Sequence, residues 1–423
     1  MRAGFRHTQW KQWGARLLAA ASTAGLSLLI LSCGASNTVD YLYVTSNLVN
    51  PGQVNVYQVD SESGALRQIA DSPYPSGGRN PVSEAAAPNG KYLYVANHDD
   101  NTIVQFAIGT DGKLYPLTTT NTPGTEPVAL TINPAGTALY VLDYYAPAAP
   151  GHPSYTDLNP GPGALIVYPV NSDGSLGTPL SVGAANYFPV QCFPTNLAIT
   201  PNGNFIYVTN TNAVVVTTSP PVTGTVPILP ASCPSSGTVS AFSVSASAVN
   251  PVAGTPFTTG AGSQPTGVIA DPGNGSVYVT DSHLNQVYTF TIQTSGALAL
   301  AGNAATGNMP MGGTVVTNAS SAKFLYVTNY KDGSLSIYSL SSGLPSLVTT
   351  SNAGSSGPLC ILADPDTGRF LYIADYIGGT IGGAELNPST GTLITNQGSP
   401  FVSSGQPTCV AAVAHPGGNK NGL

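Results

Sequence analysis

Seven short segments along the chain share one pattern of apolar and polar positions. Each contains an aliphatic residue, a tyrosine and then Val or Ile, and each ends two positions later on Ser, Asn or Asp. The copies occupy residues 41–46, 92–97, 138–143, 205–210, 276–281, 324–329 and 370–375. Their spacing of about 46 to 71 residues is typical of a β-propeller, in which each blade carries one copy of a repeated strand.

One repeat illustrates the order of strands expected in a blade. Residues 127–132 predict an inner strand, and the Pro and Gly within 133–136 predict the turn that follows it. The repeated segment 138–143 is then the second strand. Residues 163–170 alternate in polarity and predict the third strand, and a short outer strand is expected at 176–182.

The two ends of the repeat array each lack a partner. The chain opens with a second-type strand at Tyr41, and it ends with an inner-type strand at residues 407–413. We expect the C-terminal strand to complete the first blade, because this pairing leaves no open sheet edge. The predicted fold is an all-β, seven-bladed β-propeller with four-stranded blades over residues 39–416, followed by a tail at 417–423.

The N-terminal residues follow a different pattern. Four basic residues precede an apolar run at 17–31, which is short for a membrane span. The run ends in Leu31-Ser32-Cys33-Gly34, which is similar to the lipobox of bacterial lipoproteins. We therefore predict a lipoprotein signal peptide at 1–32, lipidation of Cys33 and a lipidated tether at 33–38. The alternative is an ordinary secretory peptide cleaved nearby.

Either alternative takes the protein out of the cytoplasm, and we expect the lipid-anchored form in the bacterial cell envelope, on the periplasmic or outer-membrane face. Loss of the four leader cations from 12 Lys+Arg leaves 8 against 19 Asp+Glu, a formal net charge of −11. This balance disfavours nucleic acid as a partner, because such binding needs cations against phosphates. We expect a monomer that contacts the membrane only through its lipid anchor.

Four cysteines follow Cys33, which suits an oxidising compartment. Cys192 precedes the inner strand of the fourth repeat, and Cys233 precedes the third strand of the same blade. Both loops are expected to emerge on one face of the propeller, so we predict a disulfide between these cysteines. Cys360 and Cys409 each lie two residues after the proline that opens an inner strand, and ring closure makes those strands neighbours. A disulfide across the seam and two buried free thiols remain alternatives there.

The loops at the channel mouth are the expected working face. Two long loops on adjacent blades, 144–162 and 211–236, are rich in proline and nearly uncharged. The Asn and Asp residues that end the repeated segments are expected to hold turn backbone rather than ligand. The candidate ligand-binding residues are Arg79, Asn80, Tyr144, Tyr145, Tyr330, Lys331 and Tyr376.

Glu84 is the strongest candidate for chemistry. It occupies a register in which the other inner strands carry apolar residues or glycine. A carboxylate buried there has a raised pKa and could serve as a base, with His98 or His283 as a further catalytic residue. The alternative is a hydrogen-bonded structural glutamate. No metal-ligand spacing or cofactor motif is present, so neither a metal nor a cofactor is expected.

The rhythm Pro-(Asp/Asn)-Gly-x-x-x-Tyr-Val-x-Asn resembles the seven-bladed propellers of the lactonase family, which includes the 6-phosphogluconolactonases, and the Tyr-Val-Thr-Asn repeat proteins. The resemblance covers residues 39–416 and implies lactone hydrolysis at the channel mouth by His, Arg and Glu. In the family, Pro-His and Pro-Arg-His enter the inner strands. The matching positions here are Glu126-Pro127-Val128, Pro194-Thr195-Asn196 and Pro265-Thr266-Gly267, without His or Arg.

Two functional hypotheses follow. The favoured one is a lipid-anchored binding module of the cell envelope whose partner is a protein, peptide or glycan. The alternative is a lactonase-type hydrolase that acts on a small lactone at the channel mouth through a rearranged site containing Glu84.

Overall fold

The computed structural model describes residues 37–148, 154–156, 159–211, 233, 236–245, 248–318, 321–352 and 356–416. Residues 1–36, with the candidate signal peptide and Cys33, lie outside this part of the chain, as do the tail 417–423 and most of the loop 211–236. Within the described part, no helix has the length and apolarity needed to cross a membrane.

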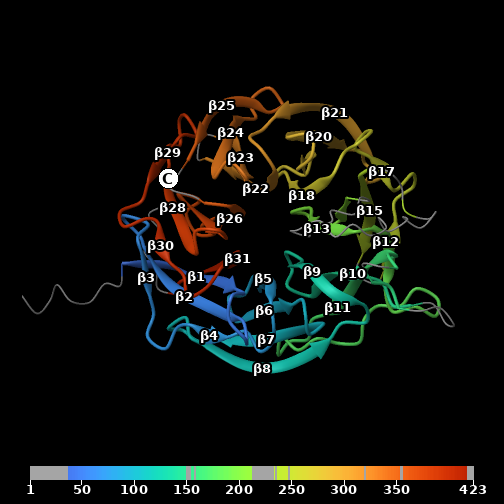
Figure 1. Cartoon of the computed structure of the whole chain (residues 1–423), viewed down its shortest axis with the longest axis horizontal. Coiled ribbons are helices and arrows are strands. Elements are labelled where there is room, and N and C mark those ends of the chain that lie inside the picture. The colour runs from blue at the N-terminus through green and yellow to red at the C-terminus, as the bar shows by residue number, and fades with distance from the viewer. Residues whose placement is uncertain are drawn as a thin grey trace, which may run out of the picture. The chain divides into compact units, whose positions relative to one another are not determined.

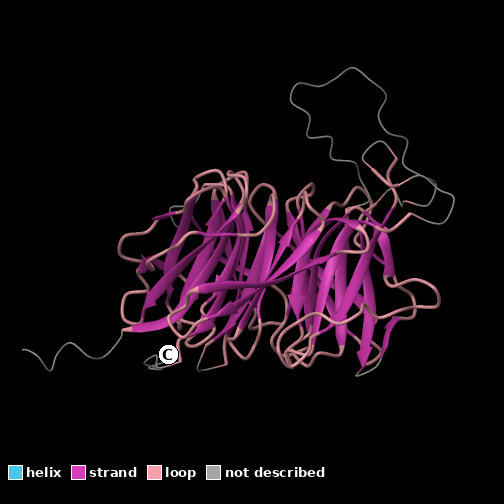
Figure 2. Cartoon of the chain, turned by 90° about the horizontal axis from the view of Figure 1, so that it is seen from below, coloured by secondary structure: helices cyan, strands magenta, loops and turns pink. Residues whose placement is uncertain are grey.

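Seven antiparallel sheets surround a central axis (Figure 1), and their strands run between the two faces of the ring (Figure 2). Inner strand first, blade 1 contains β31 (Pro407–Ala414), β1 (Thr38–Ser46), β2 (Gln53–Asp60), β3 (Leu66–Gln68) and β4 (Tyr74–Pro75). Blade 2 contains β5 (Pro81–Ala86), β6 (Tyr92–Asn97), β7 (Thr102–Ile108) and β8 (Leu114–Asn121). Blade 3 contains β9 (Thr125–Ile132), β10 (Ala138–Tyr145), β11 (Pro162–Pro169) and β12 (Phe188–Cys192).

Blades 4 to 7 follow in chain order around the ring. Blade 4 contains β13 (Pro194–Ile199), β14 (Phe205–Asn210), β15 (Thr238–Ser245), β16 (Ala248–Pro251) and β17 (Phe257–Thr258), and blade 5 contains β18 (Pro265–Ala270), β19 (Ser276–Asp281), β20 (Gln286–Ile292) and β21 (Leu298–Ala305). Blade 6 contains β22 (Pro310–Thr317), β23 (Lys323–Asn329), β24 (Ser334–Ser339) and β25 (Ser346–Ser351). Blade 7 contains β26 (Pro358–Ala363), β27 (Phe370–Asp375), β28 (Thr380–Leu386), β29 (Leu393–Thr395) and β30 (Phe401–Val402).

The predicted closure of the ring is confirmed. β31 pairs antiparallel with β1, from Asp40 opposite Ala414 to Ser46 opposite Pro407. The last strand of the chain is therefore the inner strand of the first blade, and Figure 1 shows the red β31 beside the blue β1. This pairing covers the edge of β1 that would otherwise expose a row of backbone donors and acceptors.

The outer strand of blade 3 differs from its prediction. It was expected at residues 176–182, whereas β12 spans Phe188–Cys192. The earlier residues stay beside β11 through single contacts, such as the hydrogen bond from the Leu180 N–H to the Val167 carbonyl oxygen at 2.8 Å. Pro179 has no N–H to donate to a ladder, which explains why this segment does not form a continuous strand.

The repeated tyrosine joins neighbouring blades. In five blades its hydroxyl donates to the carbonyl oxygen of a glycine in the turn after the third strand of the next blade, at 2.7 to 3.1 Å. The pairs are Tyr43–Gly112, Tyr94–Gly174, Tyr207–Gly296, Tyr326–Gly391 and Tyr372–Gly64. All five glycines have φ between 64° and 84°, a region that suits glycine. The repeated tyrosine thus supplies a hydrogen bond across five of the seven blade boundaries.

We expect Tyr94→Phe to lower the free energy of unfolding by about 1 to 2 kcal/mol, because it leaves the Gly174 carbonyl without its donor. Tyr278→Phe is the matched control, since the structure gives the Tyr278 hydroxyl no hydrogen bond within the described residues. Urea unfolding of both variants measures the difference. Equal losses in the two variants would contradict a stabilising role for the inter-blade bond.

Candidate functional site

A cavity of about 360 Å³ lies on the axis of the ring. All seven inner strands line it, each through the two residues that follow its proline. These pairs are Val82 and Ser83, Val128 and Ala129, Thr195 and Asn196, Thr266 and Gly267, Met311 and Gly312, Leu359 and Cys360, and Thr408 and Cys409. The cavity is therefore built from positions that lie about 45 to 71 residues apart in the chain.

The cavity wall is uncharged. Among the described residues that line it, none is Asp, Glu, His, Lys or Arg. Three threonine hydroxyls turn into the blade boundaries and donate to the carbonyl oxygen of the proline that opens the next inner strand. These bonds are Thr195 to Pro265 at 3.1 Å, Thr266 to Pro310 at 2.6 Å and Thr408 to Pro81 at 2.8 Å.

Asn196 is the polar side chain best placed for a ligand. It is half-buried on β13 and lines the cavity, and the structure shows no hydrogen bond for its amide group within the described part of the chain. Sequence reasoning noted Pro194-Thr195-Asn196 only for its lack of His and Arg. The signal that could have identified these positions is the Pro-Thr pair that opens three of the seven inner strands.

Glu84 lies between blades 1 and 2 and is not part of the cavity wall. Its side chain is 6% exposed. Its carboxylate accepts hydrogen bonds from the backbone N–H of Thr45, at 3.4 Å, and from the Thr45 hydroxyl. Burial raises the pKa of Glu84 to about 8, and the bonds from Thr45 oppose that rise. The geometry thus matches the structural alternative, a hydrogen-bonded buried glutamate.

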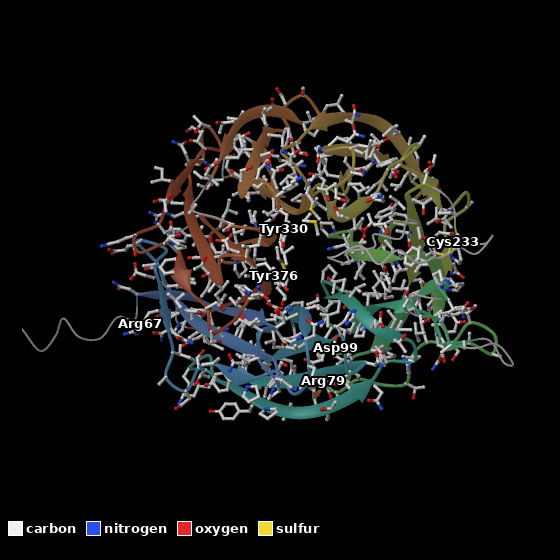
Figure 3. All side chains as sticks on the ribbon, in the orientation of Figure 1. Arg67, Arg79, Asp99, Cys233, Tyr330 and Tyr376 are labelled. Atoms are coloured by element: carbon white, nitrogen blue, oxygen red, sulfur yellow. A yellow bond between two sulfur atoms is a disulfide. The ribbon has the colours of Figure 1, made fainter. Side chains whose placement is uncertain are left out.

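His98, Arg79 and Asn80 form one polar cluster on the rim of blade 2. The Arg79 Nε donates to Asp100 Oδ1 at 2.7 Å, and this contact holds the pKa of Asp100 below its usual value. Asp99 Oδ1 accepts from the Asn80 amide at 3.0 Å and lies 2.8 Å from Nδ1 of His98. Figure 3 shows Arg79 and Asp99 on this blade. The cluster is internally paired, so Arg79 does not provide an unpaired cation.

The remaining candidates lie on three other blades. His283 is exposed in the β19–β20 loop of blade 5 and is not a cavity residue. Tyr330 and the exposed Lys331 follow β23, and Tyr376 follows β27. Tyr330 and Tyr376 lie beside the central opening (Figure 3), and burial, together with the nearby Tyr376, raises the pKa of Tyr330. The structure does not bring Glu84, His98 and His283 into one catalytic group.

The two tyrosines at the start of the loop 144–162 have different roles. Tyr144 is half-buried and lines the cavity. Tyr145 is 1% exposed and packs with Phe193 and the Cys192–Cys233 disulfide, whose Cα atoms are 5.5 Å apart. Only Tyr144 of this pair can contact a ligand in the cavity.

The Asn and Asp residues that end the repeated segments are fully buried, at 0% exposure. Asp281 accepts backbone N–H groups from Gln264, at 3.1 Å, and from His283, at 3.0 Å. Asp143 accepts the Gly124 N–H at 2.9 Å. In these two blades the carboxylates hold loop backbone at the channel-mouth end, and none of the six residues lines the cavity.

Solved structures with the same fold include three bacterial propellers. The periplasmic gluconolactonase of Pseudomonas aeruginosa is 19% identical with a TM-score of 0.66, over 90% of this chain and 100% of that chain. A candidate 6-phosphogluconolactonase from Bacteroides fragilis is 18% identical, with a TM-score of 0.67 over 90% and 99%. A protein from Lactobacillus plantarum is 16% identical, with a TM-score of 0.66 over 89% and 99%. Identities this low establish the fold alone.

No curated protein matches the chain. A family profile described as "Lactonase, 7-bladed beta-propeller" matches residues 3–145 and 229–358, which together make up more than half of the 423 residues. With the seven blades and the closure through β31, this match assigns the chain to the seven-bladed β-propeller lactonase family.

Proposed function

We propose that this lactonase-family propeller is a binding module of the bacterial cell envelope, anchored through a lipid on Cys33, which takes an uncharged ligand at the channel mouth. The ligand is a small neutral molecule or the neutral end of a peptide, protein loop or glycan. The protein acts as a monomer and without nucleic acid or a cofactor. The observation that carries this proposal is the uncharged wall of the axial cavity.

The chemistry of the wall supports a neutral ligand over a phosphorylated one. A phosphate group is normally held by several cations or by converging backbone N–H groups. The cavity offers instead apolar side chains, the Asn196 amide and the half-buried Tyr144. Arg79, one of the two cationic candidates from the sequence, is paired with Asp100 at 2.7 Å, and neither Arg79 nor Lys331 lines the cavity.

Lactone hydrolysis is the second candidate function, and the family supports it. The P. aeruginosa neighbour is named a periplasmic gluconolactonase, which is also consistent with an exported enzyme of this fold. The contact between His98 and Asp99, at 2.8 Å on the rim, is the arrangement here that best suits a general base. Glu84 is bound by Thr45 and buried, so it is poorly placed for that role.

Binding and turnover are tested together on the purified protein. Neutral sugars and sugar lactones, with their phosphorylated counterparts, are assayed by calorimetry and by acid release. We expect neutral compounds to bind without hydrolysis and phosphorylated ones not to bind. Asn196→Asp should weaken binding at least tenfold, because it places a carboxylate in an uncharged cavity. Asn204→Asp, an exposed change in the turn after β13, should leave binding unchanged.

Hydrolysis that persists in Glu84→Gln and is lost in His98→Ala would instead support the enzyme reading and place its base on the rim. Hydrolysis lost in Glu84→Gln would return the catalytic role to the buried carboxylate. Tight binding of phosphorylated compounds would contradict the neutral-ligand proposal.

A further inference from the structure

A second disulfide closes the ring from inside the channel. Cys360 lies on β26, the inner strand of blade 7, and Cys409 lies on β31, the inner strand of blade 1. Their sulfur atoms are bonded and their Cα atoms are 5.0 Å apart. Both residues line the axial cavity, and both are half-buried.

The two disulfides of the described chain differ in access. Cys192 is 1% exposed and Cys233 is 8% exposed, and both pack in a cluster with Tyr145 and Phe193. The Cys360–Cys409 bridge faces a cavity of about 360 Å³, which can admit a small molecule. Thiol–disulfide exchange requires a thiolate to reach a sulfur atom, so access decides which bridge reacts first.

The position of the bridge gives its reduction a structural consequence. β31 pairs through backbone hydrogen bonds with β1, whereas its boundary with blade 7 is a packing contact between inner strands. The bridge is the covalent link across that boundary, and it closes a loop with a sequence separation of 49 residues. Without it, the last strand is held by the ladder with β1 and by packing alone.

We propose that Cys360–Cys409 is a thiol-exchange site that small thiols reach through the channel, and that its redox state sets how tightly the ring is closed. A small dithiol attacks one sulfur as its thiolate and forms a mixed disulfide while the other cysteine leaves as a thiolate. The second thiol of the reagent then displaces the first cysteine. The products are two protein thiols and the cyclic oxidised reagent, so the bridge gains two electrons and two protons.

The first test needs no substitution. The purified full-length protein is treated with graded dithiothreitol under native conditions, quenched with iodoacetamide and mapped by peptide mass. We expect Cys360 and Cys409 to be alkylated at a dithiothreitol concentration at least tenfold lower than Cys192 and Cys233 require. Equal susceptibility, the reverse order, or alkylation of Cys360 and Cys409 without any reductant would overturn the proposal.

A second arm tests the route of entry. A dithiol immobilised on agarose beads cannot enter the channel, so it should leave Cys360–Cys409 oxidised over the time in which free dithiothreitol reduces it. Reduction by the beads at the rate of the free reagent would overturn access through the channel.

A third arm tests the effect on ring closure. Protein reduced only at this bridge should unfold in urea at least tenfold faster than the oxidised protein. The double variant Cys360→Ala/Cys409→Ala should unfold at the fast rate with or without mild reductant, and the same mild reductant should act on the wild type only. Unchanged unfolding of the selectively reduced wild type would overturn the structural consequence, and this outcome does not depend on whether the variant folds.

Discussion

Deletion of residues 405–416 is expected to abolish the cooperative unfolding transition of the entire ring. The deletion removes β31 and exposes the edge of β1 from Asp40 to Ser46. It also removes Val410 and Val413, which are 5% and 7% exposed and belong to the cores on either side of blade 1. Losing one inner strand from a closed ring affects both neighbouring boundaries, and typical stabilities of about 5 to 15 kcal/mol do not tolerate such a loss.

Calorimetry and circular dichroism of the truncated protein measure this effect. Cys409→Ala is the matched control, because it keeps the strand and removes only the bridge. A bridge that closes a loop of this size contributes on the order of 4 kcal/mol in the chain-entropy model, so the control should still melt cooperatively, at a lower temperature. A truncated chain that melts as sharply as the control would contradict closure through β31.

The free energy of unfolding should fall as the pH rises from about 4.5 to 8, and Glu84→Gln should remove part of that fall. Burial raises the pKa of both Glu84 and Asp143 to about 8. A carboxyl whose pKa is higher in the folded state than in the unfolded state binds more protons when folded, so its stabilising effect is complete below the unfolded pKa and is lost as the pH passes the folded pKa. Burial destabilises the ionised form of each of these two carboxyl groups.

Urea unfolding of wild type and Glu84→Gln at a series of pH values tests this expectation. At pH 9 the variant should be more stable than the wild type by on the order of 3 kcal/mol, whereas at pH 4.5 the two should agree to within about 1 kcal/mol. Asp143→Asn should show the same pattern. Glu62→Gln makes the same change of charge at an exposed position and should not alter the pH dependence. Parallel curves for wild type and Glu84→Gln would show that Glu84 does not ionise in this range.

The raised pKa of Glu84 could be anticipated, whereas that of Asp143 could not. Glu84 stood out because the other inner strands carry apolar residues or glycine in its register. Asp143 ends a repeated segment and was expected only to hold turn backbone. It does accept the Gly124 N–H, at 2.9 Å, and it is also completely buried, at 0% exposure. Sequence patterns identify a polar residue at a turn, and its degree of burial depends on the loop packed above it.

The relative positions of the catalytic candidates could not be predicted from the sequence either. His98 and His283 belong to loops of blades 2 and 5, and the sequence suggested that either could join Glu84. In the structure the Glu84 carboxylate turns toward Thr45 of blade 1, away from the cavity wall. The direction of a side chain relative to the axis depends on the neighbouring blade, which a repeat within one blade does not encode.

The number of blades, the order of their strands and the closure of the ring could all be predicted from the amino-acid sequence. This was possible because the same tyrosine recurs in every blade, and at five blade boundaries its hydroxyl donates to a left-handed glycine of the next turn, as in Tyr94–Gly174. Three features became visible only in the folded chain: the late outer strand β12, the disulfide between Cys360 and Cys409, and the uncharged cavity. The disulfide and the cavity depend on distances between inner strands of different blades, and such distances follow from how seven sheets pack around an axis. The late outer strand depends instead on pairing within blade 3, where Pro179 has no N–H to donate.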